Sequence, residues 1–405
     1  AYEIMPSLVG SEMCIRDRYT RFVAEQLAGD EVPDRTKQSA IATGMIRAGT
    51  WNDEPNDSAD YLYTRLEDMV HTTTSAFLGL TVKCARCHDH KFDPILQSDY
   101  YRIASFFWAG HIGQGNQGGP TEKDLGFDVY GWTDKSAKPL AIRLLINGER
   151  HKPGPEIAPG FLSAVTTLDK ALAPPPPNSK TTHRRLQFAK WITNARNPLT
   201  ARVLVNRLWQ HHFGQALVRT PNNFGYKSDP PTHPMLLDWL AAEFMEPTTC
   251  GGDPWTLKRL HKLIMMSDTY QQQSVHPQEA EYAQRDFLNR NLWKFNRHRL
   301  NSESLRDAML AVSGQINLKM GGSSFYPKMS SEALEGLSRK AGDWKDSSTD
   351  ERSRRSIYMM TKRSRLLPLM TAFDFSDTTA SCGQRDVTTV APQALALLNN
   401  HFTHS

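Results

Sequence analysis

The chain has 405 residues, of which 39% are hydrophobic, 9% aromatic and 22% charged. These proportions indicate a globular protein with room for two or three domains, and they exclude collagen, a coiled coil and a wholly disordered chain. The 48 lysines and arginines barely exceed the 43 acidic residues and are scattered along the chain, so charge gives no argument for nucleic-acid binding. The longest apolar runs are too short to cross a bilayer, and we expect no transmembrane segment.

The first eighteen residues are set apart from the fold. The run from Pro6 to Arg18 resembles translated sequencing-adapter sequence, so we interpret residues 1–18 as an artefact. We then expect the native chain to enter near Tyr19, with its true start and any export signal missing. We expect the C-terminal end to be truncated as well.

Apolar residues recur at helical spacing in four segments of the next ninety residues, and glycine or proline separates most of these segments. A segment that holds two cysteines and two histidines lies between the last two. The pattern predicts a compact, mostly helical domain over residues 19–111, with helices at 19–28, 36–47, 59–80 and 98–108.

Residues 112–180 are poorly patterned. They hold one clear strand, Leu140 to Ile146, which is followed by a turn at Asn147-Gly148. Pro174 to Pro177 form a four-proline run that favours polyproline II and stops any helix. We interpret this run as a linker and place the main domain boundary there.

The second half is helical again, and we assign residues 181–405 to a C-terminal helical domain. The Arg-rich run from Arg352 to Arg365 is interpreted as a solvated face. The fold class is therefore predicted to be mainly α, with two helical domains joined by a short irregular region that contains β structure. Predicted elements here are helices at 198–213, 234–244, 255–266, 301–313 and 392–398 and a strand at 357–360.

Five cysteines are present, and only Cys84 and Cys87 are close together, with His88 directly behind them. One pair among scattered cysteines is not a disulfide framework. Cys-x-x-Cys-His is the spacing of a c-type haem attachment, in which two thiols bond to the haem vinyl groups and the adjacent imidazole binds the iron. The motif therefore predicts haem c as cofactor, with Cys84, Cys87 and His88 as its binding residues.

Two other interpretations of the same segment stay open. Cys84, Cys87, His88 and His90 are also four possible ligands for zinc or another divalent metal, although four donors within seven residues would be strained. The two cysteines alone would make a disulfide or remain free thiols.

Catalytic residues are otherwise unassigned. Asp229 and His233 are weak candidates for an acid/base pair, since prolines and short polar residues before a helix are first of all a capping loop.

Several runs of the first half closely resemble the planctomycete cytochrome c-like domain family, and the second half resembles its usual companion, a planctomycete-specific C-terminal domain of unknown function. The resemblance implies an exported protein whose haem-binding residues are Cys84, Cys87 and His88. The matching runs are Phe22 to Asp30, Ile41 to Gly44, Ala76 to Leu80 and Cys84 to Pro94, followed by Asn206 to Trp209, Phe224-Gly225, Pro231 to Pro234, Leu237 to Leu240, Leu260 to Ile264 and Thr388 to Leu395.

The predicted function is that of an exported c-type cytochrome-like protein, periplasmic or extracellular, in electron transfer or redox chemistry with an unidentified redox partner protein. One alternative is an extracytoplasmic enzyme that depends on a non-haem metal. The other is a binding or scaffold module. Either alternative is compatible with a link to polysaccharide breakdown.

Overall fold

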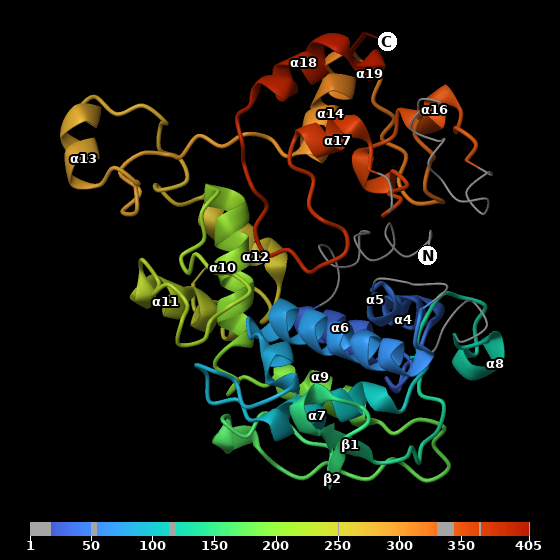
Figure 1. The fold of residues 1–405 in the computed structure, drawn as a ribbon. Helices are drawn as coiled ribbons and strands as arrows, with labels where there is room; N and C mark the ends of the chain where they lie inside the picture. The colour runs from blue at the N-terminus through green and yellow to red at the C-terminus, as the bar shows by residue number, and fades with distance from the viewer. Residues whose placement is uncertain are drawn as a thin grey trace. The chain divides into compact units, whose positions relative to one another are not determined.

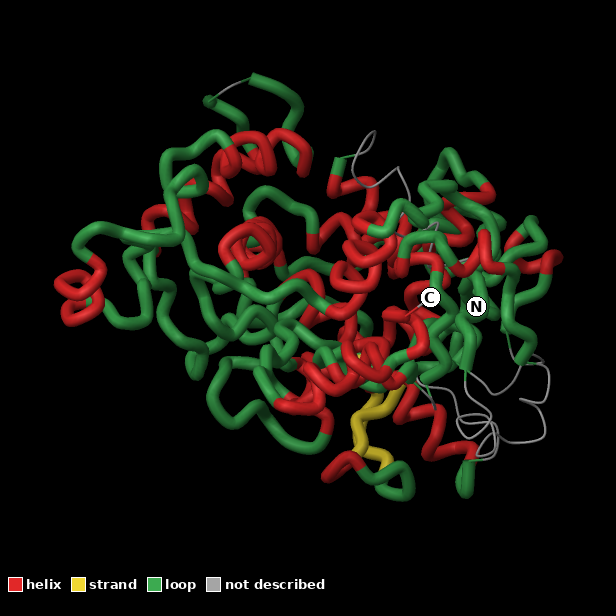
Figure 2. The backbone as a smooth tube through the Cα atoms, turned by 90° about the horizontal axis from the view of Figure 1, so that it is seen from above, coloured by secondary structure: helices red, strands yellow, loops and turns green. Residues whose placement is uncertain are grey.

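The computed structural model describes residues 18–49, 55–112, 119–249, 251–329, 344–363 and 366–404. Residues 1–17, most of the run interpreted as an artefact, lie outside them. The chain divides into two compact units between Arg297 and His298, and each is described by itself. Figure 2 shows helices joined by loops, with the strands confined to one hairpin, so the predicted mainly α class is confirmed.

The long helix α6 (Ser58–Leu78) packs against both α7 and α10 in the first unit (Figure 1). Asp57 caps its start, because the carboxylate accepts hydrogen bonds from the N–H groups of the first turn. Gly79 ends the helix with a φ of 61°, a left-handed conformation that glycine adopts without strain. The other helices before residue 112 lie close to their predicted positions: α3 (Tyr19–Ala28), α4 (Lys37–Ala42), α5 (Gly44–Arg47) and α7 (Gln97–Trp108).

A single hairpin follows these helices. β1 (Ile142–Leu145) pairs antiparallel with β2 (Pro153–Ile157), which confirms the predicted strand. The predicted turn is also present, with φ values of 56° at Asn147 and 72° at Gly148. Three short elements surround the hairpin: α8 (Glu122–Leu125), η3 (Ile146–Gly148) and η4 (Thr166–Leu168).

The proline run at Pro174–Pro177 does not divide the compact units, although we expected the main domain boundary there. The helix that follows it, α9 (Arg184–Ile192), packs against α3 and α7. Phe188 of α9 stacks on Phe106 of α7 with ring centroids 4.6 Å apart, and both rings are fully buried. One hydrophobic core therefore continues across the prolines, because helices on both sides bury their apolar faces against each other.

The rest of the first unit extends this core. Tyr19, at the start of α3, stacks on Trp255 at 6.5 Å and packs against Phe244. Burial raises the pKa of the Tyr19 hydroxyl. Residues more than 200 positions apart in the sequence thus meet in one aromatic cluster. The remaining helices are α10 (Thr200–Phe213), α11 (Pro234–Met245), α12 (Leu257–Met265) and α13 (Glu279–Arg285).

The second unit has its own small core of Phe325, Tyr358, Met359 and Met370. The strand predicted at 357–360 is wrong. Residues Ser356–Tyr358 form the short 3-10 helix η6, because the Ser356 N–H and hydroxyl both donate to Asp307 at 2.7 Å. Only one bridge, between Phe325 and Met359, remains. The helices are α14 (Ser302–Val312), α16 (Thr349–Arg352), α17 (Pro368–Ala372), α18 (Ala391–Asn399) and α19 (His401–His404).

Within the described segments, no helix combines the length and the hydropathy that crossing a membrane requires.

Candidate functional site

The Cys-x-x-Cys-His motif lies on a short 3-10 helix, η1 (Val82–Arg86), that follows the end of α6. A 3-10 helix has three residues per turn, so side chains three positions apart lie on the same face. Val82 and Ala85 accordingly point into the core, while Cys84 and Cys87 are exposed and are free thiols. The local conformation thus presents both sulfur atoms outward, one turn apart.

Contacts from three neighbouring elements fix this cysteine loop, residues 82–88. Arg86 forms an ion pair with Glu67 of α6 at 2.6 Å. Its carbonyl oxygen accepts hydrogen bonds from the Tyr101 hydroxyl at 3.1 Å and the Gln97 amide at 3.0 Å, both from α7. The same Gln97 amide donates to Leu145 O of β1 at 2.9 Å. The two thiols are therefore presented by a braced turn.

Gly148, in the turn between β1 and β2, approaches the second thiol closely. A Cβ atom at this position would lie 2.4 Å from Cys87 Sγ, and the φ of 72° is one that other residues adopt only with strain. Glycine therefore suits the turn, and any other residue here would push the Cys87 thiol aside.

His88 is exposed, and its Nδ1 lies 2.6 Å from Asp89 O. A carbonyl oxygen only accepts, so Nδ1 carries the proton and donates. The lone pair of the neutral ring is then on Nε2, which is the atom that a metal-binding histidine uses when a backbone carbonyl holds its other nitrogen. His88 therefore has the tautomer of an iron ligand.

His90 is turned the other way, and its side chain is only 7% exposed. Its Nδ1 accepts from the N–H of Asp93 at 2.9 Å, so Nε2 carries the proton and donates to Thr81 Oγ1 at 3.1 Å. Both ring nitrogens are thus engaged within the loop. The four residues considered for zinc, which are Cys84, Cys87, His88 and His90, are not brought together, and the described residues contain no group of three or more His, Cys, Asp or Glu side chains placed to hold a metal.

Met69 and His71 of α6 also carry side chains of types that can bind haem iron. Met69 is buried in the hydrophobic core. His71 is half-buried on α6, where burial lowers its pKa, and its Nδ1 has no hydrogen-bond partner. Neither residue lies in the cysteine loop, where His88 is the one histidine.

The segment after the loop is joined to a distant part of the sequence. The Asp93 carboxylate accepts the N–H of Tyr226 at 2.7 Å. The N–H of Phe224 donates to Gly79 O, also at 2.7 Å, and its ring covers that glycine so closely that a Cβ there would lie 2.8 Å away. Two runs quoted above for their family resemblance, Cys84 to Pro94 and Phe224-Gly225, thus lie against each other.

The weak acid/base candidates are not brought together. Asp229 is exposed. His233 precedes α11, where its Nδ1 lies 3.0 Å from the hydroxyl of Thr232. The structure describes no hydrogen bond between the two candidates, and their segment serves as the entry to a helix.

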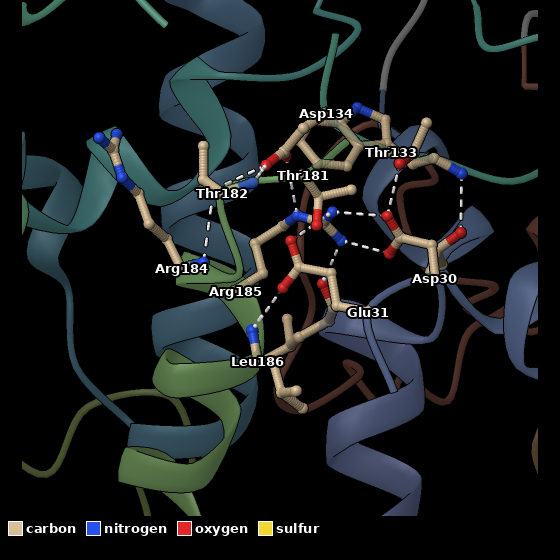
Figure 3. Close-up of polar contacts among 12 residues, drawn as sticks. Asp30, Glu31, Thr133, Asp134, Thr181, Thr182, Arg184, Arg185 and Leu186 are labelled. Atoms are coloured by element: carbon tan, nitrogen blue, oxygen red, sulfur yellow. Dashed lines mark hydrogen bonds and ion pairs between the residues drawn. The ribbon is translucent and has the colours of Figure 1, made fainter. Parts of the chain in front are cut away.

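Sequence reasoning missed a buried ion cluster in the first unit. Figure 3 shows Arg185 of α9 with three carboxylates turned toward its guanidinium, from Asp30, Glu31 and Asp134. All four side chains are at most 1% exposed. Arg185 donates two hydrogen bonds to Asp30 at 2.7 Å, one to Glu31 at 3.0 Å and one to Asp134 at 3.3 Å.

The cluster holds an excess of negative charge in the core. Thr133 and Thr182 donate further hydrogen bonds to Asp30 and Asp134. Burial raises the pKa of Glu31 to about 8, so this carboxyl group holds a proton at neutral pH. The only sequence signal was the pair Asp30-Glu31 directly after an apolar helix, which is more often a solvated helix end.

Comparison with known families agrees with the two halves of the sequence. Residues 13–111 match PSCyt2, a protein of unknown function (DUF1549), and residues 184–405 match PSD1, a protein of unknown function (DUF1553). Both families are characteristic of planctomycete proteins, so the resemblance stated from the sequence is confirmed. Neither a curated protein nor a solved structure matches the chain. The chain belongs to the PSD1 family of proteins of unknown function, with a PSCyt2 segment ahead of the PSD1 segment.

Proposed function

We propose that the chain is an exported c-type cytochrome-like protein that carries haem covalently on Cys84 and Cys87, with His88 as an iron ligand. One observation supports this above the others. Two free thiols lie one 3-10 turn apart on an exposed face, and a histidine with its Nε2 lone pair available follows directly. A bound haem supplies one-electron redox chemistry, and the protein sets its potential through axial ligands and burial.

The residues present fit this group at its attachment edge. The thiols are exposed and unoxidised, as thioether formation requires. The interior behind the loop is filled, because Tyr100 and Tyr101 of α7 are at most 1% exposed. The thiols and His88 therefore face outward, where Phe92 and Ile146 from adjoining segments expose large apolar side chains.

The braced turn would keep these donors in position through an electron-transfer cycle. The ion pair of Arg86 with Glu67 and the hydrogen bonds to Arg86 O fix the backbone between the two cysteines. A fixed ligand geometry lowers the reorganisation that accompanies a change of iron charge. Electron transfer to a protein partner is therefore the use that we assign to the site.

The metal-enzyme alternative has less support, because His90 points inward with both nitrogens engaged. The thiols alone would also form a reversible disulfide, and the experiment below distinguishes this possibility.

The test is haem staining of the full chain after export in a host that has the c-type maturation machinery. We expect the stain to survive denaturation and to disappear in the Cys84→Ala/Cys87→Ala double variant. Cys382→Ala is the matched control, since Cys382 is also a free, exposed cysteine, and it should stain as the unmodified chain does. His88→Ala should retain the attached haem but change its visible spectrum, because the iron loses its protein ligand.

Two results would overturn the proposal. One is unstained protein despite the maturation machinery. The other is equal staining with and without the two cysteines. In either case, counting thiols before and after mild oxidation would show whether the pair works as a disulfide.

A further inference from the structure

The second unit encloses a cavity of about 570 Å³. This volume is in the range of roughly 300–1,000 Å³ that is typical of small-molecule sites. Figure 1 shows α14, α17, α18 and α19, whose residues contribute to its wall, within one unit. A large part of the lining is apolar, and it includes Leu310, Phe325, Leu369, Met370 and Phe402.

The charged lining residues all have the same sign. Arg306, Lys328 and Arg352 line the cavity, and no Asp or Glu is among the lining residues that the structure describes. The amides of Gln315, Asn399 and Asn400 add hydrogen-bonding groups. Three cations without a carboxylate, beside an apolar wall, make the cavity attractive to an anion.

Arg306 is only 5% exposed, and most of its hydrogen bonds go to neutral groups. Its guanidinium donates to Arg354 O at 3.0 Å, to Ser356 Oγ at 3.1 Å and to Arg352 O. The nearest carboxylate, Asp307, is 3.5 Å away and also accepts the N–H and hydroxyl of Ser356. Burial lowers the pKa of Arg306 to about 10, which still leaves the guanidinium charged at neutral pH.

Arg352 has unused hydrogen-bonding capacity. Its Nε is buried without a partner, and its Nη2 makes a long hydrogen bond of 3.3 Å to Thr349 Oγ1. A buried N–H without an acceptor costs free energy that a bound oxygen atom would recover. Arg352 thus brings a cation with an unpartnered donor to the wall of the cavity.

We propose that this cavity binds an amphiphilic anion, a small molecule with an oxyanion group and an apolar or aromatic body. The oxyanion, a carboxylate, sulfate or phosphate, lies at Arg352 and Lys328, where the field of Arg306 also favours it. The apolar body packs against Phe325 and Leu310. This site is independent of the cysteine loop and of the function proposed for that loop.

The test uses two fluorescent probes of similar ring structure on the full chain. 1-Anilinonaphthalene-8-sulfonate carries a sulfonate, and N-phenyl-1-naphthylamine is neutral. We expect the sulfonate to bind the native protein in a one-to-one ratio and at least tenfold more tightly than the neutral probe. Near-ultraviolet circular dichroism recorded on the same samples establishes that the bound protein is folded, because partly unfolded proteins also bind the sulfonate.

Variants assign the binding to the cavity. Arg352→Gln and Lys328→Gln should each raise the Kd for the sulfonate about fivefold and leave the Kd for the neutral probe unchanged. Lys319→Gln is the matched control, because Lys319 is an exposed cation that pairs with Glu351 and does not line the cavity. Its Kd values should equal those of the unmodified chain.

Displacement then defines the headgroup. Octanoate and octyl sulfate should displace the sulfonate probe, and octanol should not. If octanoate displaces the probe at the lower concentration, the site favours a carboxylate; if octyl sulfate does, it favours a sulfate-like group. Equal affinity for the two probes, an unchanged Kd in both cation variants, or displacement by octanol as strong as by the anions would each overturn the proposal.

Discussion

Replacing Arg185 by methionine should destabilise the first unit severely. Methionine has a similar length and no charge, so the substitution keeps most of the packing volume. It removes the cation that faces the carboxylates of Asp30 and Asp134 and the carboxyl group of Glu31. The hydrogen bond from Arg185 to Leu27 O at 2.9 Å is lost as well. The change therefore tests electrostatics and hydrogen bonding more than cavity formation.

The magnitude follows from the burial of the cluster. Breaking a buried ion pair by removal of one partner costs about 3–5 kcal/mol, because the remaining charge is left without compensation. Here Asp30 loses both of its short contacts to the guanidinium, and Asp134 loses one. We expect the free energy of unfolding to fall by at least this amount at pH 7.

The pH dependence gives a second, independent signature. Glu31 has its pKa raised by burial to about 8, against 4.5 for an ordinary glutamate. Between these values the native chain holds a proton that the unfolded chain has released, so the stability contributed by Glu31 is complete below about pH 4.5 and is lost as the pH rises through 8. The variant's deficit should also grow with pH, because its carboxylates have lost their cation and ionise at greater cost.

Urea unfolding of the full chain at pH 5, 6, 7 and 8, followed by tryptophan fluorescence, measures both effects. Arg143→Met is the control: Arg143 pairs with Glu156 on the surface, where both side chains are more than half exposed, and it should cost less than about 1 kcal/mol. A loss below about 1 kcal/mol at pH 7 for the Arg185 variant, or a deficit that is the same at pH 5 and pH 8, would refute the reasoning.

Three further outcomes are expected. Gly148→Ala should lower the melting temperature and slow alkylation of Cys87, because the added methyl group meets the thiol at 2.4 Å and the φ of 72° is strained; an unchanged alkylation rate would count against the contact. Gly225→Ala should lower the melting temperature by several degrees, since the Cβ of the new alanine would lie 2.3 Å from a carboxylate oxygen of the buried Asp93. His212 Nε2 lies 2.8 Å from His261 Nδ1, and burial lowers the pKa of both rings. Stability should therefore fall as the pH drops below about 6.5, where unfolded histidines take up protons that the pair resists; His261→Asn should make the fall shallower in thermal scans.

Helices with regular apolar spacing and a clear signal for their last residue were predictable from the sequence. α3 occupies the predicted residues, and α10 ends at Phe213 as predicted. α9 was missed, because its sequence from Arg184 to Ile192 mixes charged and apolar residues without a capping signal. Its second residue, Arg185, is fully buried. Its partners lie 51 positions away at Asp134 and more than 150 positions away at Asp30 and Glu31.

The run from Arg352 to Arg365 also shows that the sequence does not reveal which arginines are buried. A cluster of arginines is usually solvated, yet Arg354 is only 1% exposed. It donates hydrogen bonds to Ser323 O at 3.0 Å and to the Glu351 carboxylate at 2.8 Å. Its guanidinium also lies over the aromatic ring of Tyr358. Backbone carbonyls of residues 321 and 323 accept hydrogen bonds from this guanidinium, and no local pattern reveals such acceptors.

The candidate site was predictable in its residues and not in its geometry. Spacing alone singled out Cys84, Cys87 and His88. It did not show that both thiols share one face, which depends on a 3-10 conformation, nor that His90 turns inward to Thr81. Those outcomes depend on hydrogen bonds that form only after the loop packs against α6 and α7.

The hydrogen bond from Tyr226 to Asp93 spans 133 positions of the chain, and this has a consequence for the order of events during biogenesis. A chain that emerges from its N-terminal end presents its cysteines well before Phe224 to Tyr226 are available to close over Gly79 and Asp93. For that interval the contacts that Phe224 and Tyr226 make with Gly79 and Asp93 are absent. Under the function proposed above, an enzyme that attaches haem would meet the cysteine loop before residues 224–226 dock beside it. Because contacts between residues far apart in the sequence form slowly, the proposed haem attachment would precede this docking.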